Sequence, residues 1–279
     1  MNKNLILIEC KDKVGLVTTI TRIVSEHQLN ITAMREFVDE TAARFFTRIE
    51  LGDEITDEKS LHTELQNNLP ENAIININPK QEKKIAVLVT KEYHCLGDTL
   101  VRHFFNTLGA SVSCVIGNYE ILRPFTERFS IPFHFVSHED KSKEQFETEI
   151  LNILKQYEPD YLVLAKFMRI LSADFVRNFP YRIINIHHSF LPAFIGANPY
   201  KKAYERGVKL IGATAHFVTN DLDEGPIIEQ QIIPVNHTHS VFDMVTAGKE
   251  IEKAVLSKAM GLVLADRVFV AGNKTIIFE

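Results

Sequence analysis

From residue 85 to residue 234, short apolar segments alternate with segments in which apolar residues recur at helical spacing. This pattern predicts strands and helices in regular alternation. Helical crossovers join parallel strands, so we expect an α/β domain built on a mostly parallel sheet. The predicted strands are 85–90, 111–117, 132–136, 161–164, the strand that carries Asn185, 209–218 and 227–234. The predicted helices are 96–108, 120–129, 143–156, 174–178, 199–206 and 240–265, and a hairpin at 268–270 and 275–278 follows them.

The first eighty residues follow a different order. Strands are predicted at 5–10, 29–37, 44–51 and 73–78, and helices at 16–27 and 58–68. The order βαββαβ is that of a ferredoxin-like, split βαβ fold. Pro79 and the charged residues after it interrupt the pattern. We therefore predict one domain at 1–80, a linker at 81–84 and a second domain at 85–279.

The composition limits the classes of partner. The chain has 279 residues and a formal net charge of -5, which gives no electrostatic reason to expect a nucleic acid or a membrane surface. Its three cysteines, Cys10, Cys95 and Cys114, are scattered and favour neither a disulfide framework nor a zinc site. The N-terminal apolar run is too short for a signal peptide or a membrane span, so we expect a cytoplasmic location.

Three polar residues, Asn185, His187 and Asp223, form the candidate site. Residues two apart on a strand share a face, so Asn185 and His187 should point the same way. Asp223 lies in a predicted turn, just before the Gly-Pro pair at 225–226. That pair should fix the loop and allow a close approach of the backbone.

These residue types suit carbonyl chemistry. The Asn185 amide and the His187 imidazole can donate to an oxygen that gains negative charge in a tetrahedral intermediate. The Asp223 carboxylate can orient or deprotonate water, or pair with His187. Ser189 lacks the tight turn of a nucleophilic serine, so water or a substrate amine is the expected attacker. Ordinary structural roles in a strand, a core and a turn would also produce this pattern.

A metal site would require His187, His188, His216 and Asp223 to converge. Adjacent histidines on a strand point to opposite faces, so His187 and His188 should not share one ion. No metal is predicted.

The loop at 91–97 follows the first strand of the second domain and contains a single glycine, Gly97. A phosphate cradle needs several glycines at close spacing, so we expect neither a dinucleotide nor a sugar phosphate here. His94 is either a polar contact in the wall of the substrate pocket or an incidental histidine of a capped loop. Cys95 has no neighbouring base in the sequence, and we expect it to be structural.

The N-terminal domain carries Asp12-Lys13-Val14-Gly15-Leu16 before its first helix and Leu29-Asn30-Ile31 at its second strand. With these motifs it resembles an ACT domain, a regulatory fold that commonly binds amino acids. Gly15 would let a ligand carboxylate approach the N-terminus of the helix. Asp12, Gly15 and Asn30 are the candidate effector-binding residues. The alternative is that Gly15 only permits a tight turn.

The second domain carries a longer set of motifs. They are Asn185-x-His187, Ser189-x-Leu191-Pro192, Gly196 and Leu222-Asp223-x-Gly225-Pro226-Ile227. With them, residues 85–267 resemble the Rossmann-like formyltransferase fold that handles 10-formyltetrahydrofolate. The resemblance implies that Asn185, His187 and Asp223 are the catalytic residues. It also implies that residues 166–172 form an apolar pterin pocket in which backbone amides read the ring edge. The candidate substrate-binding residues are Met168, Arg169, Ile170, Leu171, His94 and Gly196.

Within that family, the glycinamide-ribonucleotide transferases carry a glycine-rich phosphate loop and the methionyl-tRNA enzymes carry a basic C-terminal domain. We expect neither in this chain, whose loop at 91–97 has one glycine and whose net charge is negative. Its ACT-like domain, together with the run from Asn185 to Pro199, closely resembles the deformylase branch. The resemblance implies hydrolysis of 10-formyltetrahydrofolate to formate and tetrahydrofolate, which supplies one-carbon metabolism and purine synthesis.

The same resemblance implies a homo-oligomer, glycine or methionine as an effector, and no tightly bound cofactor. Two alternatives stay open at this point. One is transfer of the formyl group to an amine acceptor. The other is an amino-acid-sensing protein that does not catalyse a reaction.

Overall fold

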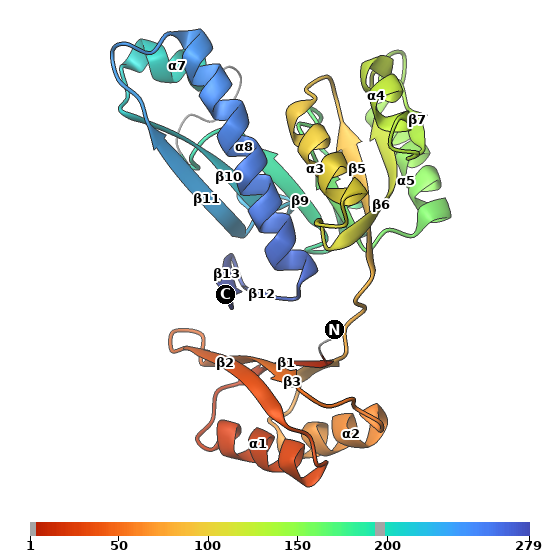
Figure 1. Cartoon of the computed structure of the whole chain (residues 1–279), viewed down its shortest axis with the longest axis vertical. Helices are drawn as coiled ribbons and strands as arrows, with labels where there is room; N and C mark the ends of the chain where they lie inside the picture. The colour runs from red at the N-terminus through yellow and green to blue at the C-terminus, as the bar shows by residue number, and fades with distance from the viewer. Residues whose placement is uncertain (1–3, 193–198) are drawn as a thin grey trace. The chain divides into compact units, whose positions relative to one another are not determined.

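The computed structural model describes residues 4–192 and 199–279, and the chain divides into two compact units. The small unit comprises the described residues up to Gln81 together with Ile276–Glu279, and the large unit comprises Glu82–Thr275. Figure 1 shows the helices and strands of each unit. Among the described helices, none combines the length and the apolar composition that crossing a bilayer requires.

The small unit has the predicted βαββαβ order, and its fold class is confirmed. Its four strands form an antiparallel sheet in the order β2-β3-β1-β4. Both helices cover the same face of this sheet (Figure 1). There, leucine and isoleucine side chains of the helices pack against those of the strands. The elements are β1 (Asn4–Lys11), α1 (Leu16–Glu26), β2 (Ile31–Asp39), β3 (Arg44–Leu51), α2 (Glu58–Asn68) and β4 (Ile74–Ile77).

The large unit contains a seven-stranded sheet in the order β11-β10-β9-β8-β5-β6-β7. The five strands from β7 to β9 are parallel, and β10 and β11 extend the sheet with antiparallel pairings. The predicted mostly parallel sheet is therefore confirmed. The strands are β5 (Lys83–Val89), β6 (Ala110–Gly117), β7 (Phe133–Phe135), β8 (Tyr161–Leu164), β9 (Ile183–His187), β10 (Leu210–Phe217) and β11 (Ile227–Pro234).

Helices cover both faces of this sheet. Side chains of Ile85 and Val87 in β5 pack in one core with α3 and α8, whereas Ala86 and Leu88 pack in a second core with α5 and α6. This alternation follows from the period of two along a strand. The helices are α3 (His94–Phe104), the 3₁₀ turn η1 (Glu120–Leu122), α4 (Arg123–Glu127), α5 (Lys143–Tyr157), α6 (Ala173–Arg177), α7 (Pro199–Arg206) and α8 (Val241–Leu264). The strands β12 (Val268–Ala271) and β13 (Lys274–Ile277) form the C-terminal hairpin.

Two helices differ from the prediction. The segment predicted as one helix at 120–129 is a 3₁₀ turn followed by a short α-helix. Pro124 in the first turn of α4 lacks an N–H donor and favours a helix start at that point. Helix α3 begins at His94 rather than at residue 96, so His94 lies in the first turn of a helix and not in the preceding loop.

Helix α8 packs closely against Tyr200 of α7 at Gly248. A Cβ atom at Gly248 would lie 2.2 Å from Tyr200 Cζ. The Tyr200 ring is held in place because its hydroxyl donates a 2.6 Å hydrogen bond to Glu252.

We therefore expect Gly248→Ala to lower the free energy of unfolding by about 1–3 kcal/mol, because the methyl group overpacks the contact. Urea denaturation measures the change. Gly261→Ala is the matched control on the same helix, since a Cβ there meets nothing within 4 Å. It should stabilise the protein by up to about 1 kcal/mol through helix propensity. A Gly248→Ala variant as stable as the control would contradict the prediction.

Candidate functional site

Two neighbouring antiparallel strands, β9 and β10, carry the polar residues of the site. Their register places Asn185 opposite His216, and His187 opposite Thr214. Side chains alternate along a strand, so these four residues share one sheet face, and the core with α8 lies on the other. The structure thus places Asn185 and His187 on the same face.

Asp223 reaches this face through the turn that follows β10. Its φ of 57° lies in the left-handed region, which aspartate enters more readily than most residues. The turn is tight because Phe217 N–H donates to the Pro226 carbonyl at 2.9 Å. A Cβ atom at Gly225 would lie 1.8 Å from the Phe217 carbonyl oxygen, so only glycine fits there. The Gly-Pro pair therefore fixes the position of the carboxylate.

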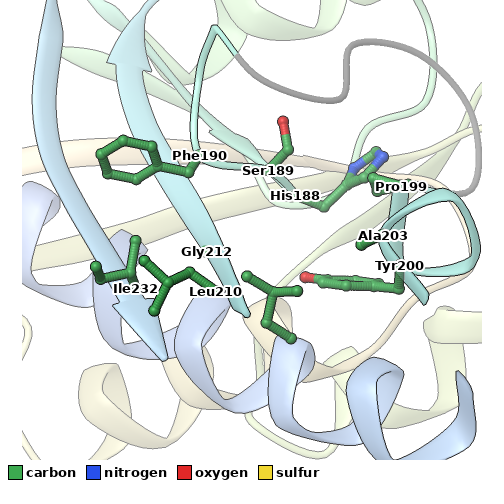
Figure 2. A pocket seen from close by; sticks show the side chains of 10 residues that line it. His188, Ser189, Phe190, Pro199, Tyr200, Ala203, Leu210, Gly212 and Ile232 are labelled. Atoms are coloured by element: carbon green, nitrogen blue, oxygen red, sulfur yellow. The ribbon is translucent and has the colours of Figure 1, made fainter. Parts of the chain in front are cut away.

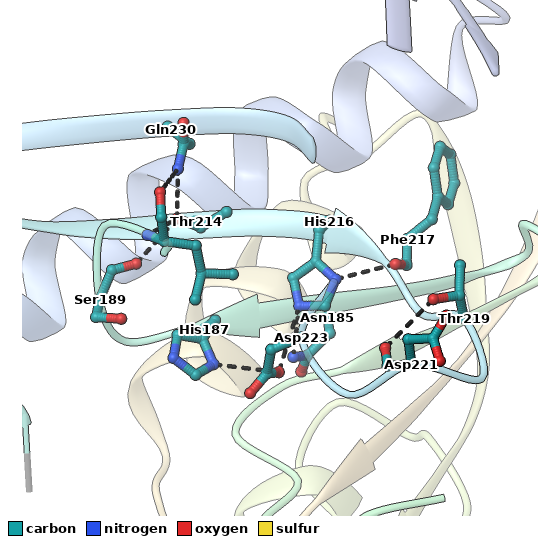
Figure 3. A network of polar contacts seen from close by, with 11 residues as sticks. Asn185, His187, Ser189, Thr214, His216, Phe217, Thr219, Asp221, Asp223 and Gln230 are labelled. Atoms are coloured by element: carbon teal, nitrogen blue, oxygen red, sulfur yellow. Dashed lines mark hydrogen bonds and ion pairs between the residues drawn. The ribbon is translucent and has the colours of Figure 1, made fainter. Parts of the chain in front are cut away.

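Figure 3 shows how the polar side chains meet. His187 Nδ1 lies 3.3 Å from Asp223 Oδ1, and His216 Nε2 lies 3.7 Å from the same oxygen. The Asn185 amide nitrogen lies 3.1 Å from His216 Nε2. His216 Nδ1 lies 2.9 Å from the Phe217 carbonyl oxygen, which assigns the ring hydrogen to Nδ1. His216 Nε2 then accepts a hydrogen bond from Asn185.

Asp223 is ionised at neutral pH. Burial alone would raise the pKa of its carboxyl group, but the two imidazoles beside the carboxylate, that of His187 first and that of His216 second, outweigh burial and hold the pKa well below its usual value. The site therefore presents a carboxylate, which can accept a hydrogen bond but cannot donate one.

Two donor positions of the site are not used by Asp223. The Nε2 atom of the buried His187 has no hydrogen-bond partner among the described residues. The Asn185 amide uses one of its two N–H groups on His216, so a second N–H remains for a ligand. When His187 is protonated, it can donate from Nδ1 to Asp223 and from Nε2 to a bound molecule.

Asn185, His187 and Asp223 all line a pocket of about 310 Å³. Its walls are Leu164, residues 166–171, Asn185, residues 186–188, His216 and residues 218–223. Met168 and Ile170 are 56% and 62% exposed, which makes them available to an apolar ligand rather than to the protein core. The structure thus brings four candidate substrate-binding residues together with the candidate catalytic residues. The four are Met168, Arg169, Ile170 and Leu171.

Two other candidate substrate residues stand apart. His94 does not line this pocket; it is buried, and its Nε2 lies 2.7 Å from a carboxylate oxygen of Glu252. Gly196 lies outside the described residues.

The histidine pair at the end of β9 differs from the expectation. The rings of His187 and His188 are stacked, with centroids 5.1 Å apart, and both line the pocket. The prediction that they point to opposite faces is wrong, because β9 ends at His187 and strand alternation stops there.

Among the described residues, one group could hold a metal ion, and it consists of His94, Cys95 and Glu252. All three are buried. The Lys166 ammonium lies 3.1 Å from Glu252 and already balances its charge. Burial raises the pKa of the Cys95 thiol, which disfavours the thiolate that a metal would need. These contacts suit a structural ion pair better than a metal ligand set.

In the small unit, the candidate effector residues lie near element ends. Gly15 is the N-cap of α1, with φ of 89° and no side-chain cap. Asp12 and Asn30 are exposed, and the Asn30 N–H donates to Asp53 at 2.7 Å. The N-terminus of α1 therefore leaves backbone donors available for an anion.

Sequence reasoning did not assign roles to Thr214, Gln230 and His216 as supports of the site. The Thr214 hydroxyl donates to the Ser189 carbonyl at 2.9 Å and accepts from Leu191 N–H at 3.1 Å (Figure 3). Gln230 donates to the same hydroxyl at 2.9 Å and so ties β11 to the turn after His187. The spacing of Thr214 and His216 indicates that both lie on one face of a strand. Placing that face beside Asn185 and His187 required the register of β9 and β10.

A second cavity, of about 220 Å³, lies beside the first and shares His188 with it. Figure 2 shows Phe190, Leu210 and Ile232 facing Tyr200 and Ala203 of α7 across this cavity. Its described lining residues are mainly apolar and bring no acid–base pair together.

Comparison with known proteins gives two domain matches. A family model described as formyl transferase matches residues 83–260, and a model described as ACT domain matches residues 4–61. Both resemblances drawn from the sequence motifs are confirmed.

Several known proteins are similar over nearly the whole length. Formyltetrahydrofolate deformylase from Escherichia coli strain K12 is 52% identical over 268 residues, which cover 96% of this chain and 95% of that protein. Formyltetrahydrofolate deformylase from Haemophilus influenzae is 49% identical, with 99% of each chain covered. The crystal structure of a formyltetrahydrofolate deformylase from Pseudomonas syringae pv. tomato matches with a TM-score of 0.93 at 36% identity, covering 99% of this chain and 94% of that one.

The geometry of the turn predicts the effect of Gly225→Ala. The added methyl group would push the turn away from the Phe217 carbonyl and displace Asp223. Because a displacement of about 1 Å can cost about a hundredfold in rate, we expect kcat/KM to fall by at least about tenfold. Steady-state kinetics measure the loss, and a circular dichroism spectrum checks that the variant is folded. Wild-type kinetics in a folded variant would show that the close approach does not place Asp223.

The low pKa of Asp223 predicts how Asp223→Asn changes stability with pH. A carboxyl whose pKa is depressed on folding stabilises the native state at pH values above its unfolded pKa of about 3.9, and this contribution is lost as pH falls toward the folded pKa. The variant should therefore be less stable than the wild type at pH 7, and the difference should shrink below about pH 5. Urea denaturation at a series of pH values tests this; a difference that grows on acidification would refute it.

Proposed function

The chain belongs to the formyltetrahydrofolate deformylase family, and from this membership we infer that it is a hydrolase that converts 10-formyltetrahydrofolate to formate and tetrahydrofolate. The reaction breaks the bond between the formyl carbon and N10 of the folate, and water supplies the oxygen that appears in formate.

We propose that the large unit performs this reaction with Asn185, His187 and Asp223. The observation that carries the proposal is the contact between Asp223 and His187 within the pocket walled by residues 166–171. An ionised carboxylate, an imidazole and an amide line one cavity together with the apolar side chains of Met168, Ile170 and Leu171. A pterin ring suits such side chains. Its polar edge suits the backbone N–H groups of Arg169, Ile170 and Leu171, which form no hydrogen bond within the described residues.

In the first step, Asp223 orients a water molecule and accepts its proton as the oxygen attacks the formyl carbon. Its ionisation at neutral pH makes it an acceptor at the outset. The carboxyl group passes this proton on when the intermediate collapses.

The attack produces a tetrahedral intermediate with a negative oxygen. Asn185 donates its second amide N–H to this oxygen, and protonated His187 donates from Nε2. Neither donor has to move far, because Asn185 is held by His216 and His187 by Asp223.

Collapse of the intermediate breaks the bond to N10. The nitrogen leaves as a secondary amine and needs a proton, for which His187 is the donor we propose. Asp223 then returns the proton taken from water to His187, with which it is already in contact. Formic acid and tetrahydrofolate result; formic acid loses its remaining proton to solvent as formate, and the side chains regain their starting state.

Transfer of the formyl group to an amine is not favoured. The residues after β5 lead directly into α3, where His94 and Cys95 are buried, instead of forming a glycine-rich loop of free N–H groups. Such a loop is what a phosphate-bearing acceptor would require.

For the small unit we propose control by an amino acid, with glycine or methionine as the effector. The uncapped N-terminus of α1 at Gly15 supports this, because its backbone donors can bind a carboxylate. We further propose a homo-oligomer, a cytoplasmic location and a reaction without a tightly bound cofactor.

An assay without acceptor tests the proposed reaction. Purified protein mixed with 10-formyltetrahydrofolate alone should release formate in proportion to the tetrahydrofolate formed. Asp223→Asn and His187→Ala should each lower kcat by about a hundredfold or more, because each removes a group that acts in the transition state. Glu224→Gln is the matched control in the same turn and should keep near-normal turnover, since Glu224 does not line the pocket.

Formate release that depends on an added amine would overturn the hydrolytic function. Near-wild-type turnover in Asp223→Asn or His187→Ala would overturn the residue assignment. Repeating the assay with glycine and with methionine tests the effector: we expect a change in rate that is lost in Gly15→Val, whose side chain would strain the φ of 89° and cover the helix N-terminus.

A further inference from the structure

Residues 166–172 of the pocket wall have no regular secondary structure. Two of their side chains, Met168 and Ile170, are largely exposed. We refer to residues 166–172 as the wall segment. Within the described parts of the chain, the backbone N–H groups of Arg169, Ile170 and Leu171 form no hydrogen bond. A segment with so few internal contacts must owe its shape to anchors elsewhere in the protein.

The first anchor is at Lys166. Its φ of 62° is rare for a residue with a side chain, so surrounding contacts must hold it. Its ammonium group lies 3.1 Å from Glu252 of α8, a side chain that is only 1% exposed. Glu252 also accepts hydrogen bonds from Tyr200 at 2.6 Å and from His94 at 2.7 Å.

The charge of Glu252 is maintained inside the protein. Burial raises the pKa of its carboxyl group, but the His94 hydrogen bond, the Lys166 charge and the Tyr200 hydrogen bond outweigh burial and lower the pKa to about 2. Each carboxylate oxygen is engaged by at least one donor, so the Lys166 ammonium meets a fixed charge.

The second anchor is at Ser172, the other end of the wall segment. Glu147 of α5 is also buried, and one of its oxygens accepts a 2.7 Å hydrogen bond from Ser172 N–H. Its other oxygen accepts a hydrogen bond from the Ser172 hydroxyl. Between the two ends, Met168 N–H donates to the Thr90 hydroxyl at 2.9 Å.

The two glutamates come from opposite sides of the sheet. Helix α8 packs in the core on one face, and α5 packs in the core on the other. One carboxylate therefore holds each end of the wall segment, and each is itself fixed on a helix that the sheet supports. Burying a carboxylate destabilises the folded state unless hydrogen bonds or opposite charges compensate for the lost water. Here Lys166 and Ser172, the two ends of the pocket wall, supply part of that compensation.

We propose that Glu147 and Glu252 are positioning residues for the folate substrate, which act by clamping the two ends of the wall segment and so set the shape of the pterin-facing wall. This proposal rests on the proposed function, because it assumes that the wall contacts the folate. Neither glutamate lines the pocket, so neither touches the substrate.

The clamp predicts a specific kinetic signature. Glu252→Gln leaves the buried Lys166 ammonium without its counter-charge, and Glu147→Gln removes an acceptor from Ser172. Either change should loosen the wall and raise KM by about tenfold, which is the loss expected for a hydrogen bond to a charged group. Asn185, His187 and Asp223 are placed by other elements, so kcat should stay within about twofold.

The experiment measures formate release as a function of 10-formyltetrahydrofolate concentration for the wild type and both variants. Calorimetric titration with tetrahydrofolate under argon should show the same rise in Kd. Glu229→Gln is the matched control, because Glu229 pairs with Lys258 of α8 at 3.0 Å but does not touch the wall segment. It should keep the wild-type KM and Kd. If Glu252→Gln does not fold, Glu147→Gln still decides the question, since it removes a single hydrogen bond.

The outcomes separate the clamp from the reaction itself. A wild-type protein that releases no formate would refute the proposed function. A wild type that does turn over, combined with folded variants that keep its KM and Kd, would refute the clamp alone. A fall in kcat at unchanged KM would also refute it, since the glutamates would then act on the chemical step.

Discussion

The contact between Asp223 and His187 is the interaction on which the site depends. It joins a residue at the end of a strand to a residue in a distant turn, and both must be placed within a few tenths of an ångström. The turn is closed by the backbone pairing of Phe217 with Pro226, which only a glycine at 225 permits. The strand is placed by its register with β10, which also brings His216 to the same carboxylate. The pKa of Asp223 is low because the turn and the strand register together bring its carboxylate next to His187 and His216.

The strands β9 and β10 of the mixed sheet have one polar face, and the site lies on that face. Asn185, His187, Thr214 and His216 occupy one face of β9 and β10, where a packed helix would leave their polar atoms without partners. Instead, the wall segment and the turn before Asp223 border that face and leave a pocket. The opposite face of the same strands is apolar and packs on α8. One pair of strands thus serves as core on one side and as binding surface on the other.

Much of the fold could be predicted because its signals are local. The alternation of strands and helices after residue 85 needed only periodicity, and so did the βαββαβ order before it. Asn185 and His187 could be placed on one face for the same reason. The neighbouring His188 could not, because the end of β9 depends on where pairing stops.

The remaining features depend on long-range contacts. The support that His216 gives to Asn185 required the register of two strands. The position of His94 is set by Glu252, which lies 158 residues away in the sequence. The periodicity of a sequence does not reveal such a pair. A glutamate in a helix is expected to lie on the surface, and only its contacts show that it is buried.

The pocket lining has one further consequence. Among the described residues, all those that line the pocket fall between Leu164 and Asp223, and none of them belongs to β5, β6 or β7. The loops that must close to assemble the pocket therefore span at most about sixty residues, and the entropy lost in closing them grows only with the logarithm of that length. The binding surface is therefore formed by one continuous region of the chain, and most of the large unit supports this region without lining the pocket.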